Sequence, residues 1–115
     1  MIAVIFELEP TPEGRGDYLD IAARLVADLR NIDGFISVER FQSLTTEGKI
    51  LSLSFFRDEA AVAAWRNTVT HRAAQTAGRG GLFSGYRLRV ARVLRDYGMT
   101  DRAQAPDDSR KAHSD

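Results

Sequence analysis

Cysteine is absent from the chain, and histidine occurs only twice among its 115 residues. Without cysteine the protein has no disulfide, no thiolate zinc site, no iron–sulfur cluster and no cysteine nucleophile. Two histidines are too few for a metal site that uses several histidines of one chain. We therefore expect no metal site.

Neither sign of charge is in excess, because sixteen Lys and Arg residues balance sixteen Asp and Glu residues. Nucleic-acid-binding domains usually carry a basic excess, and proteins of membrane surfaces carry polybasic clusters. No apolar run approaches the roughly 20 residues of a membrane span, and the first strand does not read as a signal peptide. We expect a soluble, cytoplasmic protein with neither nucleic acid nor membrane as partner.

The length fits one domain, since domains cluster at about 100–150 residues. Residues 98–115 are rich in charge and contain no large apolar residue after Met99. Such a segment buries too little surface to offset the entropy lost on ordering. We therefore expect a folded domain over residues 1–97 and a flexible tail over residues 98–115.

Hydrophobic periodicity predicts four strands and two helices. Alternation with a period of two marks the strands, and apolar residues at every third or fourth position mark the first helix. Strands are predicted over 2–9, 35–43, 49–56 and 86–97, and helices over 15–32 and 60–65. Gly34 is a candidate left-handed residue after the first helix, and Asp58 is a good N-cap for the second. The β-branched run Thr68–Thr70 predicts a break, followed by a second helical piece over 71–77.

The order β-α-β-β-α-β is that of the ferredoxin-like α+β fold, an antiparallel sheet with both helices on one face. Two helices cover only one face of four strands, yet several strands carry apolar residues on both faces. We therefore predict a homodimer that packs sheet against sheet. Ser52 and Ser54 are small and leave space over their face of the sheet.

Five segments together resemble the antibiotic biosynthesis monooxygenase family of dimeric α+β barrels. They are Ala3–Phe6, Asp33–Phe35, Trp65–Asn67, His71–Gln75 and Tyr86–Val90. The resemblance extends over nearly all of residues 2–97 and implies the ferredoxin-like fold, assembled as a dimeric barrel. It also implies a pocket between the sheet and the helices. Some members of this family oxidise polycyclic aromatic phenols with O2 and no cofactor, and others degrade haem.

The resemblance assigns roles to individual residues. Trp65 matches the pocket tryptophan, His71 lies where quinone-forming members have a tyrosine, and Arg87 lies near the family's arginine. Ala61 stands where those members have an asparagine. Haem-degrading members use an axial histidine and a tryptophan, and the interval between them is longer than that between Trp65 and His71 here. They also have an asparagine on the first strand, in the region where this chain has Phe6. The cofactor-free reaction is therefore favoured, with haem as the alternative cofactor.

Two residues are predicted to be catalytic. The imidazole of His71 can accept a phenolic proton near neutral pH, and Trp65 can stack on a flat substrate. The structural alternatives are a helix-capping His71 and a Trp65 packed in the core. In a continuous helix their side chains would point about 120° apart, so a shared pocket requires the break at Thr68–Thr70.

Four further residues are predicted to bind substrate: Asn67, Arg87, Phe6 and Ser52. An exposed polar position for Asn67 and a solvated or dimer-bridging Arg87 are the alternatives. The sequence thus predicts a monooxygenase that acts on a small aromatic or polyketide-type molecule without a cofactor. A haem-binding or haem-degrading protein, or a non-catalytic small-ligand-binding dimer, remains open.

Overall fold

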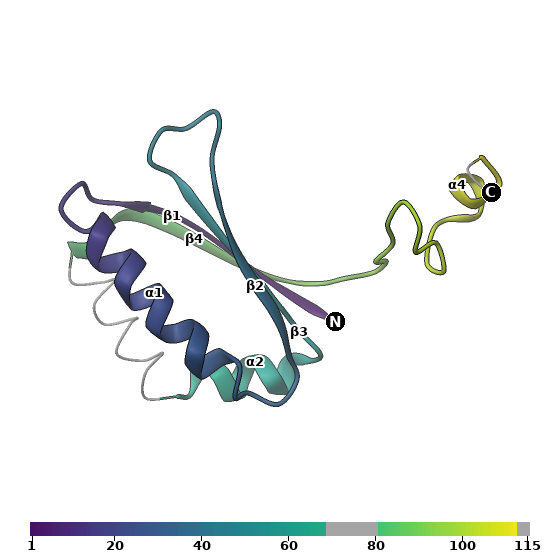
Figure 1. Cartoon of the computed structure of the whole chain (residues 1–115), viewed down its shortest axis with the longest axis horizontal. Coiled ribbons are helices and arrows are strands. Elements are labelled where there is room, and N and C mark those ends of the chain that lie inside the picture. Colours follow the sequence, from purple (N-terminus) through teal and green to yellow (C-terminus); the bar gives the residue numbers. More distant parts are fainter. Residues whose placement is uncertain (69–80, 113–115) are drawn as a thin grey trace.

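The computed structural model describes residues 1–68 and 81–112. Within them the chain forms β1 (Ile2–Pro10), α1 (Arg15–Leu29), β2 (Phe35–Gln42), β3 (Ile50–Phe56), α2 (Glu59–Arg66), β4 (Phe83–Arg92) and α4 (Asp107–Ala112). The strands pair antiparallel in the order β2-β3-β1-β4, and α1 and α2 lie on the same side of the sheet (Figure 1). The predicted ferredoxin-like fold is confirmed. The sheet is open, so one chain does not close a barrel.

Two elements, α1 and β4, differ from the predictions by three residues or more at an end, and the bounds of the other predicted elements within the described residues agree to within one residue. α1 ends at Leu29, since the next residues form a turn in which Ile32 donates its backbone N–H to the Leu29 carbonyl. β4 spans Phe83–Arg92 rather than 86–97 because its partner β1 begins at Ile2, which is paired with Arg92. Beyond that pair, the N–H of Val93 bonds to the carbonyl of Met1, and the strand has no further partner.

The predicted start of α2 is confirmed, because the Asp58 carboxylate accepts the backbone N–H of Ala61 at 2.9 Å. The helix ends at Arg66, with Asn67 as its C-cap, immediately before the predicted break. Residues 69–80 lie outside the described part of the chain. The helical piece predicted over 71–77, and His71 with it, therefore remain predictions.

Strand register divides the side chains of the sheet into two faces. Residues directly opposite each other in an antiparallel pair share a face. On the face beneath the helices, β1 presents Ile2, Val4, Phe6 and Leu8 opposite Phe56, Ser54, Ser52 and Ile50 of β3. On the other, which we call the open face, Ala3, Ile5 and Glu7 lie opposite Phe55, Leu53 and Leu51.

Among the residues that the structure describes, the core forms two separate buried clusters, both between the helices and the sheet. The first contains Ile2, Leu29, Phe56, Ala61, Val62 and Trp65. The second contains Leu8, Tyr18, Ala22 and Ile50, with Phe6, Leu82 and Phe83 packed against it. α1 contributes to both clusters, whereas α2 contributes only to the first.

Gly34, between α1 and β2, has a φ of +89° as predicted for a left-handed residue. A Cβ atom there would lie 2.9 Å from the Cβ of Ala61. We expect Gly34→Ala to lower the free energy of unfolding by about 2–4 kcal/mol, because backbone strain adds to overpacking. Chemical denaturation measures this change.

Gly48 provides the matched control, since its φ is also positive (+80°) and a Cβ there would meet nothing within 4 Å. Gly48→Ala is expected to cost only the strain, about 1–2 kcal/mol. Equal losses in the two variants would contradict a role for the contact between Gly34 and Ala61.

Arg57 ties the end of β3 to the turn before β2. Its guanidinium donates two hydrogen bonds to Asp33, both at 3.2 Å, and one to Asp58. The hydrogen bonds from Arg57 hold the pKa of Asp33 below its usual value. The backbone N–H of Ala61, followed by Arg57, lowers the pKa of Asp58.

These lowered pKa values predict a loss of stability in acid. The folded protein binds fewer protons than the unfolded chain, so the free energy of unfolding rises with pH in this range. The stabilisation should be complete above about pH 5 and should decline as pH falls through the unfolded values near 4. Urea denaturation over a pH series tests this. In Arg57→Gln the free energy of unfolding should fall less steeply as the pH is lowered. An unchanged fall would contradict the role of Arg57 in lowering these pKa values.

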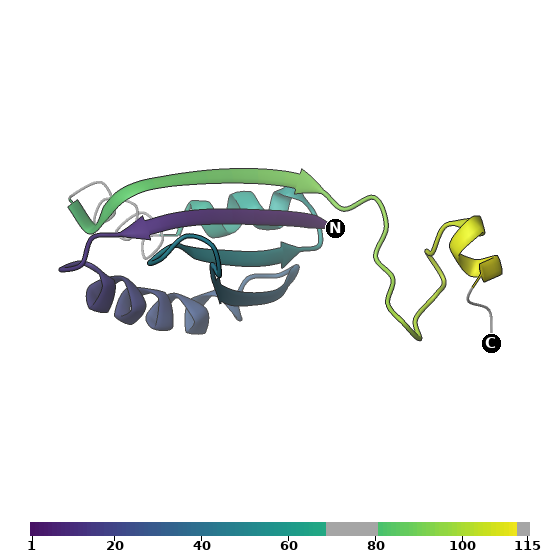
Figure 2. The ribbon, with the colours of Figure 1, turned by 90° about the horizontal axis from the view of Figure 1, so that it is seen from above.

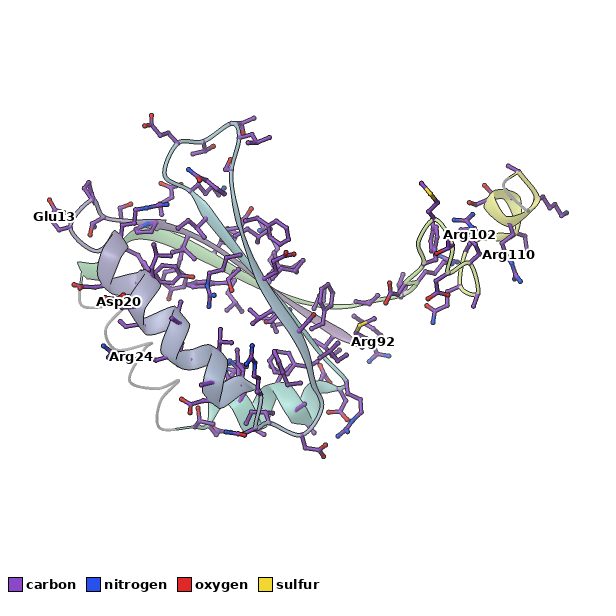
Figure 3. The ribbon with its side chains drawn as sticks, in the orientation of Figure 1. Glu13, Asp20, Arg24, Arg92, Arg102 and Arg110 are labelled. Atoms are coloured by element: carbon purple, nitrogen blue, oxygen red, sulfur yellow. The ribbon has the colours of Figure 1, made fainter. Side chains whose placement is uncertain are left out.

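The chain after β4 leaves the sheet and runs to α4 (Figure 2). Arg102 organises this segment: it donates hydrogen bonds to the carbonyls of Gly98 and Ser109 and lies over the ring of Tyr97. Figure 3 shows Arg102 and Arg110 there, well away from the sheet. Helix α4 was not predicted, and the flexibility of residues 98–115 remains a prediction.

Candidate functional site

The middle of the helix-facing side of the sheet is incompletely covered. Val4, Phe6, Ser52 and Ser54 face the helices, yet all four are partly exposed, while the residues at both ends of the same strands are buried. We call these four residues the central strip. The two serines belong to neither buried cluster, and their small side chains fill less space than the apolar residues on either side. The space predicted over Ser52 and Ser54 is consistent with this partial exposure.

Aromatic rings line one end of the central strip. The ring of Phe6 meets Phe83 and Tyr86 edge-to-face, with centroids 5.8 and 5.7 Å apart, and Tyr18 of α1 meets Phe83 at 5.5 Å. Edge-to-face contacts at these distances are favourable. The rings form an apolar, aromatic wall at this end of the strip. The sequence predictions included Phe6 but not the other three rings.

The edge strand β4 extends this surface. Leu88 lies opposite Phe6, and Val90 lies opposite Val4, so both face the helix side of the sheet. Each is nevertheless 49% exposed. A partly open apolar surface therefore runs from Ser52 across Phe6 to Leu88, with Tyr86 at its end.

A cation lies at the opposite end of the central strip. Arg40 of β2 is directly opposite Ser52, on the helix-facing side. Its Nη2 donates a 3.4 Å hydrogen bond to the backbone carbonyl of Ala22 in α1. The sequence predictions missed Arg40, although the period of two places it on the same face as Val38.

The predicted site residues do not all come together. Phe6 and Ser52 lie directly opposite each other on the central strip. Trp65 is 8% exposed and packs in the first buried cluster, against which Val4 of the strip also packs. Asn67 is exposed at the end of α2, where its backbone N–H donates to Ala63. The core-packing alternative for Trp65 is thus present in the structure.

Arg87 lies on the other side of the sheet. It is directly opposite Glu7, whose side chain belongs to the open face, so it does not share a face with Phe6 or Ser52 within one chain. It borders a hollow of about 360 Å³ together with Glu7, Lys49 and Arg89. This position fits the dimer-bridging alternative better than the pocket between sheet and helices.

Glu7 pairs with two basic residues that border this hollow. Its carboxylate accepts a 2.8 Å hydrogen bond from Arg89 and lies 3.7 Å from the Lys49 amine. The hydrogen bond from Arg89 and the charge of Lys49 hold the pKa of Glu7 below its usual value. Glu7 therefore stays ionised and is not suited to act as a general base near neutral pH.

Within 1–68 and 81–112, no group of three or more His, Asp or Glu side chains is arranged to hold a metal ion. No helix in that part of the chain is long and apolar enough to cross a membrane.

An antiparallel β2-β3-β1-β4 sheet, with two helices on one side and a partly open strip beneath them, defines a ferredoxin-like α+β domain with a candidate small-molecule site. Residues 1–77 match the family model described as antibiotic biosynthesis monooxygenase. The chain belongs to this family, as the resemblance in its sequence implied.

Two relatives and one solved structure illustrate the similarity. The chain is 52% identical over 93 residues to the jasmonate monooxygenase ABM of Pyricularia oryzae, over 81% of this chain and 43% of that protein. It thus spans less than half of that relative's length. It is 31% identical over 93 residues to the uncharacterized protein YqjZ of Bacillus subtilis, over 81% of this chain and 79% of that protein. Rv0793 of Mycobacterium tuberculosis has the same fold, with a TM-score of 0.75 at 18% identity, over 84% of this chain and 98% of that one.

Proposed function

We propose that the protein is a monooxygenase that oxidises a small aromatic or polyketide-type molecule with O2, without a metal, flavin or haem cofactor, in the cytoplasm. The observation that carries the proposal is the central strip, a partly exposed apolar surface beside the aromatic wall of Phe6, Phe83 and Tyr86. Family membership supplies the reaction class. The name of the fungal relative adds jasmonate, an organic anion, to the substrates worth testing.

The reaction needs a substrate with an acidic C–H or O–H group. In the proposed step His71 removes this proton, and the resulting carbanion or phenolate donates electrons to O2. For an activated methylene, both hydrogens leave with one oxygen atom as water, and the other oxygen atom becomes a carbonyl. The substrate is then the only reductant. Asn67 and Arg87 remain the proposed polar contacts, and Arg87 would reach a substrate only from the open face.

The open face supports the second part of the proposal, a homodimer packed sheet against sheet. Ile5, Leu51, Leu53 and Phe55 form a partly exposed apolar patch there, and Phe41 at its border is 43% exposed. Covering such a patch with its own copy removes apolar surface from water. Light scattering of the purified protein should give the mass of two chains, and the mass of one chain would overturn this part.

Oxygen uptake tests the proposed activity. Protein freed of metals by chelation should consume O2 when an anthrone, a tricyclic ketone with an activated methylene, is added. Addition of haem should not be required. If haem instead gives a sharp Soret band and uptake depends on it, the cofactor-free reaction is wrong.

A further inference from the structure

The guanidinium of Arg40 lies between β2 and α1 without an acidic partner among the residues that the structure describes. Within the described part of the chain, the buried Nε of Arg40 has no hydrogen-bond partner, and the side chain makes one hydrogen bond, from Nη2 to the Ala22 carbonyl at 3.4 Å. Residues 69–80 contain neither Asp nor Glu, so they supply no carboxylate either. A guanidinium has five N–H donors, and leaving the buried Nε–H without a partner is costly.

The surroundings of Arg40 suggest what would pair with it. Across the sheet, Ser52 lies opposite Arg40 and Phe6 lies opposite Ser52. Adjacent strands are about 4.8 Å apart, so the backbones of Arg40 and Phe6 are two strand spacings, roughly 10 Å, apart. A small molecule with a ring at one end and an anionic group at the other can lie across these strands.

We propose that Arg40 binds the carboxylate of the substrate, and that the substrate is a small organic acid whose ring lies against Phe6. A planar carboxylate matches the fork of a guanidinium and can accept two of its hydrogen bonds. Ser52, between the two ends, can donate a further hydrogen bond to the anion. A single arginine balances one negative charge, which favours a monoanion. This inference rests on the proposed function, since it assigns the substrate class of the same site.

A purely structural Arg40 would behave differently. If its role were to hold β2 against α1, replacing it would destabilise the protein with or without ligand. If Arg40 instead binds an anionic ligand, Arg40→Gln removes a partly buried charge that has no partner in the ligand-free protein. The unfolding temperature of the ligand-free variant should then be unchanged or higher. A marked fall in that temperature would overturn the proposal.

Binding of a matched pair of probes tests the proposal directly. Naphthoate and naphthamide have the same ring system but differ in charge, and calorimetry measures the affinity of each for the full chain. Arg40→Gln should raise the Kd of naphthoate about tenfold or more, because a hydrogen-bonded charge pair is lost. It should not change the affinity for naphthamide.

Arg24→Gln is the control, since Arg24 carries the same charge on the exposed side of α1, away from the sheet (Figure 3). It should leave both affinities unchanged. Equal Kd values for naphthoate in the wild type and in Arg40→Gln would overturn the assignment of Arg40, whatever the outcome of the oxygen-uptake assay. Arg40-dependent naphthoate binding, together with no O2 uptake in the anthrone assay, would support the anion site and contradict the oxygenase.

Discussion

Replacing Trp65 by alanine is expected to lower the free energy of unfolding by about 3–5 kcal/mol, the usual cost of removing a large buried aromatic side chain. Trp65 is 8% exposed and packs with Ile2, Leu29 and Phe56, so it joins both helices to the sheet. Natural domains are stable by only about 5–15 kcal/mol, so the variant should be partly unfolded at mild denaturant concentrations. Circular dichroism follows the transition without depending on the chain's single tryptophan.

Two further variants serve as controls for the loss of stability in Trp65→Ala. Trp65→Phe keeps an aromatic ring in the cluster and should lose clearly less stability than Trp65→Ala. Arg66→Ala replaces the exposed residue next to Trp65 and should change the free energy of unfolding by about 0.5 kcal/mol or less. A loss under about 1 kcal/mol in Trp65→Ala would mean that the ring is not a core residue, contrary to its burial.

The second large effect concerns activity. We expect His71→Ala to reduce kcat by about 10²- to 10⁴-fold, the usual contribution of a general base, while leaving the circular dichroism spectrum unchanged. In the wild type, kcat/KM should rise with pH as the imidazole loses its proton, and this rise should disappear in the variant. Steady-state oxygen uptake over a pH series provides both measurements.

The chain offers a matched control in its other histidine, His113. His113→Ala removes the same side chain from the predicted tail and should leave kcat and its pH dependence unchanged. If His71→Ala keeps the full kcat, or if both histidine variants lose it equally, the role of His71 as the base is wrong.

The fold could be predicted in detail because its signals are local. The period of two in β1 and β3 correctly grouped Phe6 and Leu8, and likewise Ser52 and Ser54, and Asp58 marked the start of α2. The end of β4 could not be predicted, because Leu94 continues the apolar alternation. The strand ends instead at Arg92, where pairing with β1 runs out, and that is a property of strand register.

The site was predicted less well, for a physical reason. β4 carries apolar and charged residues on both faces, so its composition does not show which face lies under the helices. Only the pairing of Arg87 with Glu7 places Arg87 on the open face. Tyr18 and Phe83 are more than sixty residues apart in the sequence, and no sequence spacing predicts their contact. Arg40 could have been found, because an arginine at an inward-facing strand position is itself a signal.

The most direct test of the central claim is a single-turnover oxidation of an anthrone by chelated, haem-free and flavin-free protein under isotopically labelled O2. One labelled oxygen atom should enter the product carbonyl, and one molecule of O2 should be consumed per molecule of product. The rate should fall with His71→Ala and not with His113→Ala. Product without label, or turnover only after haem, flavin or a metal ion is added, would contradict cofactor-free oxygenation by this protein.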